Sequence, residues 1–434
     1  MKTRLNIFWF RRDLRLEDNH GLFEALKGDY KVLPIFIFDS EILEKLPEHD
    51  ARVTFIYQTI QNINTLLQHK YNTEITLYKG KPIDIYKQLI KEHDIQSVYT
   101  NHDYEPYARK RDSEINDLLT LNHIKFRTYK DQVIFEKDEV VKKDNSPYLV
   151  YTPYMKKWKE TFKSIDFKSY GSENLLSNLI TNQLPSNLSL SDIGFKVSLQ
   201  PIKPYKITSY LIQNYETTRN FPAQDSTSKL GPHLRFGTVS IREMVEKATK
   251  ETNEVFWQEL IWREFFTQIL WHFPHTQTKS FKPKYDRIIW RNNEAEFKTW
   301  CEGKTGYPLV DAGMRQLNTT GFMHNRVRML VGSFLCKHLL IDWRWGEAYF
   351  AEKLHDYDMA SNIGNWQWVA GSGVDAAPYF RIFNPTTQIE KFDKQLSYIN
   401  KWVPDFQELT YPTPIVDHKF ARERCLTTFK EALQ

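Results

Sequence analysis

Short apolar runs that end in polar residues recur through the first part of the chain, at residues 4–10, 31–39, 74–78 and 97–100. Runs of this kind are typical of parallel strands that are buried on both faces. Helical patterns lie between them, and in 51–70 apolar residues recur at spacings of three and four, which marks one face of a helix. These residues are Val53, Ile56, Ile60, Ile63 and Leu67. The alternation predicts an open, parallel α/β sheet with flanking helices.

The hydrophobic pattern changes after this predicted sheet. From about Phe162 to Tyr205 the composition shifts to Ser, Asn, Leu, Lys and Pro with little periodicity, which indicates a connector. From about Ile207 onward helical spacing dominates, so the second half is predicted to be almost entirely helical. We therefore expect an α/β domain at 1–130, an inter-domain connector at 131–205 and an all-α domain at 206–434.

Composition places the chain among globular proteins that work in a reducing compartment. Charged residues make up 26% and aromatic residues 15% of the chain, which excludes a disordered protein. The first fifteen residues have charges too close together for a signal peptide, and the longest uncharged run, Asn174 to Ser191, is rich in polar amides and contains Pro185. The three cysteines, Cys301, Cys336 and Cys425, are far apart and offer no zinc spacing. We expect a cytoplasmic protein with no membrane segment and no metal.

The charge balance and the missing motifs narrow the function further. The net charge of +5 is a small excess, so charge alone indicates nucleic acid only weakly. No G-x-G-x-x-G follows the first predicted strand, and the chain contains no P-loop, no G-x-S-x-G and no H-E-x-x-H. Ten of the twelve tryptophans lie after residue 200, which assigns any aromatic chemistry to the second half.

The stretch from Asp356 to Trp368 carries the most specific chemistry. Its sequence, DYDMASNIGNWQW, holds two aspartates, two tryptophans and two asparagines in thirteen positions. Amides and carboxylates tune a flat redox ring, and indoles pass electrons or stack on flat substrates. Trp366 and Trp368 point roughly 200° apart on a helix. The alternative interpretation is a buried tryptophan pair with helix caps.

Two further helical segments place polar groups on one face. In 256–266, Glu259, Trp262, Arg263 and Phe266 follow helical spacing and suit a cavity for a flat, polar, anionic ligand. The alternative is a salt-bridged surface helix with Trp262 half-buried.

In 321–330, Asn325, Arg328 and Met329 share a face while Arg326 points elsewhere. One arginine is then free to pair with a carboxylate and the other to reach a phosphate; the alternative is an amphipathic helix with two solvated arginines. The hydroxyl-rich run 225–231 suits a phosphate, although such runs are common in loops.

These segments, in this order, closely resemble the photolyase/cryptochrome flavoproteins over essentially the whole chain. The matching segments are WFRRDLRLEDN (9–19), TSKL (227–230), ELIWREFF (259–266), GYPLVDAGMRQL (306–317), MHNRVRM (323–329), DWRWGE (342–347), NIGNWQWVAGSG (362–373) and DAAPYFRIFNPTTQ (375–388). The resemblance implies an α/β antenna domain and a helical domain that holds FAD in a U-shaped conformation.

The resemblance also implies a set of cofactor contacts. Arg328 and Asp356 match the ion pair beside the flavin ring, Asp358 a second carboxylate, and Asn362 the amide facing flavin N5. An amide there suits a fully reduced, anionic flavin. The remaining expected cofactor contacts are Tyr215, Thr227, Ser228, Lys229, Leu230, Glu259, Arg263 and Asn325. One departure is Gly231, where Ser is usual.

Three further groups of residues match functional positions of the family. Trp366, Trp343 and Trp290 match a chain that carries an electron from the surface to the flavin. Glu259, Trp262, Met329, Asn362 and Trp368 match the catalytic residues, with Trp262 and Trp368 flanking a flipped-out lesion. Arg219, Arg263, Arg326 and Arg381, together with the two flanking tryptophans, match the DNA contacts.

Individual residues favour one activity of the family. Met329 and Asn362 are typical of class I repair enzymes for cyclobutane pyrimidine dimers, where (6-4) enzymes and cryptochromes differ. We therefore expect light-driven repair of such dimers in single- or double-stranded DNA by a monomer, cytoplasmic and nucleoid-associated when bound. The alternatives are a cryptochrome-type photoreceptor, a (6-4) photolyase and a generic flavin oxidoreductase.

The second, antenna chromophore is left open. In folate-binding relatives an Asn-Glu pair follows the segment that matches YEPYAR (104–109), and here Tyr107 and Ala108 replace it. A deazaflavin, a flavin, a folate bound differently, or no antenna at all are the alternatives.

Overall fold

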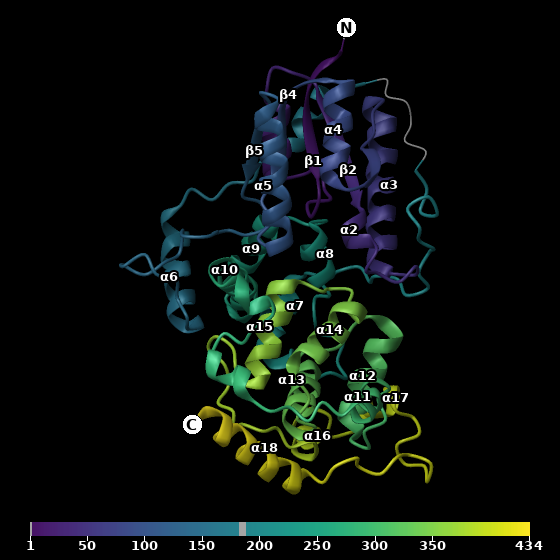
Figure 1. Ribbon diagram of the computed structural model, residues 1–434, viewed down its shortest axis with the longest axis vertical. Coiled ribbons are helices and arrows are strands. Elements are labelled where there is room, and N and C mark those ends of the chain that lie inside the picture. Colours follow the sequence, from purple (N-terminus) through teal and green to yellow (C-terminus); the bar gives the residue numbers. More distant parts are fainter. Residues whose placement is uncertain (1, 182–187) are drawn as a thin grey trace. The chain divides into compact units, whose positions relative to one another are not determined.

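The computed structural model describes residues 2–181 and 188–434 (Figure 1). Part of the expected connector and of the uncharged run, 182–187, lies outside the described residues. The chain forms two compact units that interleave along the sequence. Unit 1 comprises Met1–Glu136, Thr161–Pro204 and Leu230–Lys250, and unit 2 comprises Lys137–Glu160, Tyr205–Lys229 and Glu251–Gln434.

Unit 1 is built on a five-stranded, fully parallel sheet with strand order β3-β2-β1-β4-β5. The strands are β1 (Arg4–Phe10), β2 (Val32–Asp39), β3 (Thr76–Gly80), β4 (Asp94–Asn101) and β5 (Lys125–Tyr129). The four predicted strands and the α/β fold class are confirmed. The sequence pattern did not predict β5, because this edge strand has the mostly polar sequence KFRTY and lacks an apolar run.

Helices pack on both faces of this sheet (Figure 1). Along β1, Leu5, Ile7 and Trp9 enter one buried cluster, whereas Phe8 and Phe10 enter another. The predicted apolar stripe of α3 packs into the second cluster, with Val53, Ile60 and Leu67 fully buried. The helices of unit 1 are α1 (His20–Leu26), α2 (Ser40–Leu43), α3 (Ala51–Tyr71), α4 (Pro82–Glu92), α5 (Pro106–Leu121), η1 (Ser172–Asn178), α8 (Gly231–Phe236) and α9 (Ile241–Thr249).

A buried ionic cluster ties the late segment 230–250 into unit 1. Arg15 and Arg242 both bind the carboxylate of Asp131, at 2.8 Å and 2.7 Å, and Arg242 also binds Asp18 at 2.9 Å. Burial raises the pKa of Asp131, but the two guanidinium groups outweigh it and lower the pKa to about 2. This cluster joins α9 to residues more than a hundred positions earlier in the chain.

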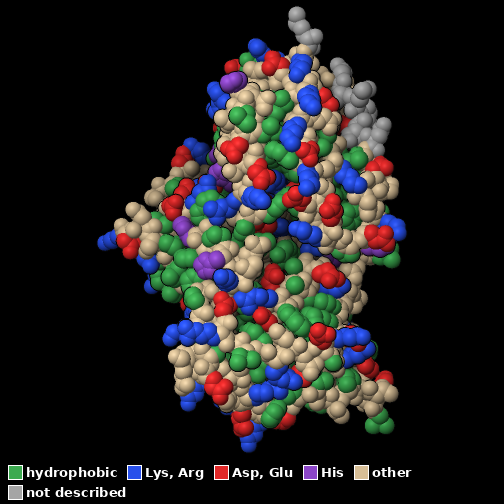
Figure 2. Space-filling view, in the orientation of Figure 1, with side chains coloured by type: hydrophobic (Ala, Val, Ile, Leu, Met, Phe, Trp, Pro, Cys, Tyr) green, Lys and Arg blue, Asp and Glu red, His purple; other side chains and the backbone are tan. Residues whose placement is uncertain are grey.

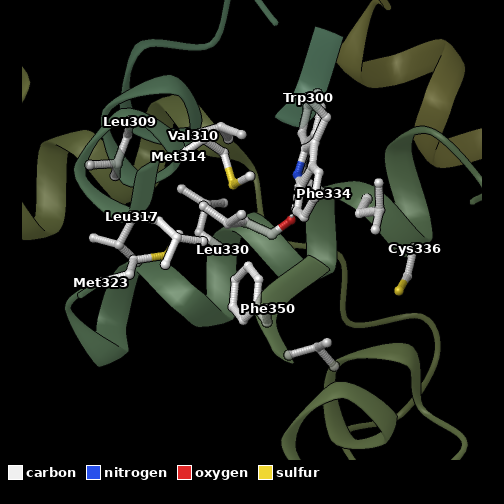
Figure 3. Close-up of a cluster of buried hydrophobic side chains, with 14 of the residues drawn as sticks. Trp300, Leu309, Val310, Met314, Leu317, Met323, Leu330, Phe334, Cys336 and Phe350 are labelled. Atoms are coloured by element: carbon white, nitrogen blue, oxygen red, sulfur yellow. Dashed lines mark hydrogen bonds between the residues drawn. The ribbon is translucent and has the colours of Figure 1, made fainter. Parts of the chain in front are cut away.

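The regular elements in the described residues of unit 2 are helices joined by loops, apart from an isolated bridge between Val141 and Pro147, as expected for the second half of the chain. Its largest core gathers Trp300, Leu330, Phe334 and Phe350 from four different helices, and the Trp300 indole N–H donates to the carbonyl of Val331 at 3.2 Å (Figure 3). The helices are α6 (Tyr151–Ser164), α7 (Ser209–Thr218), α10 (Val255–His272), η2 (Pro274–Gln277), η3 (Pro283–Arg287), α11 (Glu294–Cys301), α12 (Pro308–Thr320), α13 (Asn325–Ser333), η4 (Phe334–His338), α14 (Trp343–Lys353), α15 (Met359–Ala370), α16 (Pro385–Phe392), α17 (Ser397–Trp402) and α18 (His418–Leu433).

The helix predicted over 321–330 begins four residues later than expected. Gly321 ends α12 in the left-handed conformation, with φ of 62°, and His324 then caps α13 by accepting from the N–H of Arg326. Gly321 is thus a stop signal inside the apolar pattern. None of the helices in the described ranges is long and apolar enough to cross a membrane.

We predict that Asp131→Asn lowers the free energy of unfolding by about 3 kcal/mol, because it leaves two buried guanidinium groups without their shared carboxylate. The folded-state pKa of about 2 lies below the unfolded value of about 3.9. The contribution of Asp131 is therefore complete above pH 4 and is lost as the pH falls towards 2. Urea unfolding of both proteins at pH 7 and at about pH 3 measures the difference.

The control is Asp94→Asn, because the Asp94–Arg4 ion pair is exposed and water weakens it, so its loss should change the free energy of unfolding little. Equal effects of the two substitutions, or a difference that grows on acidification, would contradict this interpretation of the cluster.

Candidate active site

Unit 2 contains a cavity of about 340 Å³. This volume lies within the range of small-molecule sites. Its walls come from α10, α13, α14, α15, the segment before α15 and the residue that ends α7. The lining residues are Arg219, Glu259, Trp262, Arg263, Phe266, Asn325, Arg328, Met329, Gly332, Phe350, Leu354, Asp356, Tyr357, Asp358, Ser361, Asn362, Asn365, Trp366, Trp368 and Val369.

Helical spacing brings the three expected groups of α13 to this cavity. Asn325, Arg328 and Met329 all line it, whereas Arg326 does not. The guanidinium of Arg326 instead lies over the ring of Phe392, 4.5 Å from its centroid, with Nη1 3.7 Å from the sulfur of Met329. Arg326 thus contacts Met329, a residue of the cavity wall, without lining the cavity itself.

A two-pronged ion pair joins α13 to the segment before α15. Arg328 Nη1 and Nη2 lie 3.1 Å and 2.9 Å from the two carboxylate oxygens of Asp356, and Arg328 Nε donates to the carbonyl of Met323 at 2.7 Å. Such fork-to-fork pairing fixes both orientation and distance. The charges of both side chains are therefore held at the cavity wall.

Asp358 and Asn362 occupy the start of α15. Asp358 caps this helix by accepting from the N–H of Ser361 at 3.1 Å. The alternative interpretation of this stretch, which included helix caps, is therefore correct for Asp358. The Asn362 amide donates through Nδ2 to Glu347, to its carbonyl oxygen at 3.2 Å and to its carboxylate at 3.0 Å. The Oδ1 atom of Asn362 is thereby left for a ligand in the cavity.

Glu347 is a residue that the sequence patterns did not single out. Burial raises the pKa of its carboxyl group, and hydrogen bonds from Asn362 and Tyr357 oppose this. Its only signal was its place in the segment DWRWGE (342–347). The structure shows it as the group that orients the Asn362 amide.

On α10, the expected face opens onto the same cavity. Glu259, Trp262, Arg263 and Phe266 all line it. Glu259 Oε1 accepts from Arg219 Nη1 at 2.6 Å, and Arg219 also lines the cavity. The alternative interpretation of this segment was a surface helix with a salt bridge. The ion pair is present, but it lies in the wall of the cavity. Glu259 Oε2 remains for another donor.

The three tryptophans expected to carry electrons belong to one aromatic region. Trp366 and Trp343 are buried in the largest core of unit 2, and Trp290 packs against it half-buried. Trp366 lines the cavity, and its ring lies 4.9 Å from Phe350 and 6.3 Å from Trp300. The sequence patterns did not predict that Trp300 is a neighbour of Trp366. Trp368 is half-buried and also lines the cavity.

Other expected residues lie outside the cavity lining. Thr227 accepts from Lys229 Nζ at 3.0 Å, and the Lys229 backbone is left-handed, with φ of 55°. Tyr215 packs edge-on against Phe256 at 5.3 Å, and Ser228 is buried. Leu230, also buried, belongs to unit 1.

Arg381 is exposed, and its segment is tied to the core. The carbonyl of Arg381 accepts from Lys337 Nζ at 2.8 Å, and Lys337 is only 1% exposed. Burial lowers the pKa of this lysine to about 8.

Over the face shown in Figure 2, Lys and Arg side chains are interspersed with Asp and Glu side chains, in keeping with the small net charge.

In unit 1, Tyr107 and Ala108 differ from the folate-binding pattern, and both pack against other parts of the protein. The Tyr107 hydroxyl donates to Asp39 at 2.6 Å. Burial is the main cause that raises the pKa of the Tyr107 phenol well above its usual value, and this hydrogen bond is the second cause. Ala108 is buried.

Comparison with known proteins gives the same assignment as the segments of the sequence. A family model described as the FAD binding domain of DNA photolyase matches residues 256–410, and one described as DNA photolyase matches residues 6–172. A deoxyribodipyrimidine photo-lyase of Synechococcus is 35% identical, covering 96% of this chain and 95% of the relative. That of Agrobacterium fabrum is 36% identical, covering 99% and 98%.

Solved structures with similar folds lead to the same family assignment. A class III photolyase from Agrobacterium tumefaciens has a TM-score of 0.86 at 34% identity, covering 100% of this chain and 98% of that chain. An archaeal photolyase from Sulfolobus tokodaii, solved with two FAD molecules, has a TM-score of 0.80 at 34% identity, covering 99% and 100%. The expected fold class, FAD-binding domain and deoxyribodipyrimidine photo-lyase activity are confirmed, while assignment to class I stays a prediction. The chain therefore belongs to the DNA photolyase family.

Proposed function

We propose that the cavity of unit 2 is where this DNA photolyase repairs cyclobutane pyrimidine dimers under light. The observation that carries the proposal is that one cavity gathers the flavin-side pair Arg328 and Asp356 with the lesion-side residues Glu259, Trp262 and Trp368. We assign the antenna role to 1–130, the connector role to 131–205 and the cofactor and DNA roles to 206–434.

The residues of the cavity fit FAD. The Arg328–Asp356 pair and Asp358 supply fixed charges at the wall, and the Asn362 Oδ1 accepts a hydrogen bond without adding negative charge. Tyr215, Thr227, Ser228, Lys229 and Leu230, with Glu259, Arg263 and Asn325, are proposed to complete the cofactor contacts. When FAD is bound in its fully reduced, anionic form, it supplies an electron after absorbing light. This electron would split the dimer and then return to the flavin.

The chain's own residues hold the dimer. A dimer is weakly paired in the duplex, so moving it into a cavity takes less energy than moving normal bases. The indoles of Trp262 and Trp368 replace the stacking that the lesion loses. Glu259, whose Oε1 is occupied by Arg219, offers Oε2 to N–H groups of the bases, and Met329 completes the wall. The hydrogen bond from the bases to Glu259 orients the lesion while its ring bonds break.

Arginines are proposed to hold the DNA backbone. Arg219, Arg263, Arg326 and Arg381 bind phosphates in any sequence, so affinity should fall as salt rises. We propose that the monomer acts on single- and double-stranded DNA, in the cytoplasm and at the nucleoid.

Light-dependent repair by the purified, FAD-containing protein tests this function. With a reductant and blue light, a single-stranded oligonucleotide carrying one thymine dimer should regain its thymine absorbance, and a dark sample should not. Glu259→Gln keeps the size of the side chain but removes its charge, and we expect about a tenfold lower repair yield per absorbed photon. Photoreducible FAD without any repair would favour the photoreceptor alternative, and a (6-4) substrate would then be tested.

We predict that Glu347→Leu weakens FAD binding by about tenfold, because the Asn362 amide loses the carboxylate that accepts from it at 3.0 Å and keeps only the backbone carbonyl of residue 347 at 3.2 Å. Glu347→Gln retains an acceptor and should bind FAD as the wild type does. Flavin titration of the apoprotein measures both. Similar losses in the two variants would show that the negative charge of Glu347 matters and that orientation of the amide does not.

For the tryptophans, we predict that Trp343→Phe slows photoreduction of oxidised flavin at least tenfold while chemically reduced protein still repairs dimers, because phenylalanine is much harder to oxidise than tryptophan. Trp345→Phe is the matched control, two residues further along the same helix. Flavin absorbance under illumination gives the photoreduction rate. Unchanged photoreduction in Trp343→Phe would remove that residue from the proposed chain.

A further inference from the structure

Tyr151, at the start of α6, covers one face of the cavity residue Trp262. The two rings are stacked, with centroids 3.6 Å apart and an interplanar angle of 9°. Trp262 lines the cavity, whereas Tyr151 is buried and does not. Because the phenol ring covers one face of the indole, a base that stacks on Trp262 has to use the other face.

Two hydrogen bonds hold Tyr151 in this position. Its hydroxyl donates to the carbonyl of Gln258 at 2.7 Å, one helical turn before Trp262 on α10. Its backbone N–H donates to the carboxylate of Asp375 at 3.0 Å. The phenol ring is therefore fixed to the same helix that carries the indole, and the start of α6 is fixed to the segment that follows α15.

An indole held in this way is pre-organised. An exposed tryptophan on a cavity wall has several rotamers, and a ligand that stacks on it has to select one of them. A stacked aromatic pair is favoured over its separated rings. Tyr151 thus removes the alternative orientations before any ligand arrives.

We propose that Tyr151 is a positioning residue for Trp262, and that it contributes to the discrimination between dimer-containing and undamaged DNA. The inference rests on the proposed function, because it is a flipped-out dimer that would stack on the free face of Trp262. Undamaged DNA leaves its bases in the duplex and contacts the backbone-binding arginines, so its affinity does not depend on the Trp262 plane.

Three variants separate the role of the stacked ring from general packing. Tyr151→Leu removes the ring, and Tyr151→Met is a second variant without a ring in case the first does not fold. Tyr151→Phe keeps the ring and loses the hydrogen bond to Gln258. The matched control is Tyr154→Leu, because Tyr154 is 1% exposed on the same helix and packs 5.2 Å from Phe265, which Tyr151 also contacts.

Each FAD-containing variant would be titrated with two double-stranded oligonucleotides, one with a thymine dimer and one without. We expect Tyr151→Leu or Tyr151→Met to weaken binding of the dimer about fivefold and to leave undamaged DNA unchanged, in line with the strength of aromatic pairs. Tyr151→Phe should stay within about twofold of the wild type.

Tyr154→Leu should lower the melting temperature but keep the wild-type ratio of the two affinities. The proposal is overturned if the ratio is kept without the Tyr151 ring, or if Tyr154→Leu lowers the ratio equally. A wild-type protein with no preference for the dimer would instead count against the proposed function of the cavity.

Discussion

The ion pair between Arg328 and Asp356 joins α13 to the segment that leads into α15, and α13, this segment and α15 together supply most of the polar side chains of the cavity. A cavity of about 340 Å³ inside a helical core must hold its charges in place, because a charge without a partner there would be strongly unfavourable. The two-pronged geometry satisfies both groups. With Arg328 held in this way, its neighbours on the same face, Asn325 and Met329, are also placed at the wall.

The remaining walls follow the same principle of paired polar groups on helix faces. Arg219 neutralises Glu259 and leaves one carboxylate oxygen available, and Glu347 orients the amide of Asn362. Arg328, Glu259 and Asn362 therefore each have a partner that fixes the direction of the side chain. Such a site is rigid before ligand binding, which suits a reaction that depends on the distance between an electron donor and its acceptor.

Much of this arrangement could be predicted from the sequence wherever it depends on local periodicity. The buried parallel strands follow from short continuous apolar runs. The apolar face of 51–70 and the polar faces of 256–266 and 321–330 follow from repeats of three to four residues. The edge strand β5 was missed because it has no apolar run. Leu230–Lys250 belongs to unit 1 through long-range contacts such as Arg242–Asp131, which leave no periodic trace in the sequence.

Partners from distant segments could not be predicted for the same reason. Glu347 and Asn362 are fifteen residues apart on different helices, and Tyr151 and Trp262 are more than a hundred apart. The sequence showed that each type of residue was present, and the fold decided which of them meet.

The most direct test of the account is a crystal structure of this chain with FAD and a DNA strand that carries a thymine dimer. The account predicts the flavin ring beside the Arg328–Asp356 pair and Asn362, with the dimer inside the cavity between Trp262 and Trp368. A dimer bound outside the cavity, or a flavin ring distant from Asn362, would contradict it.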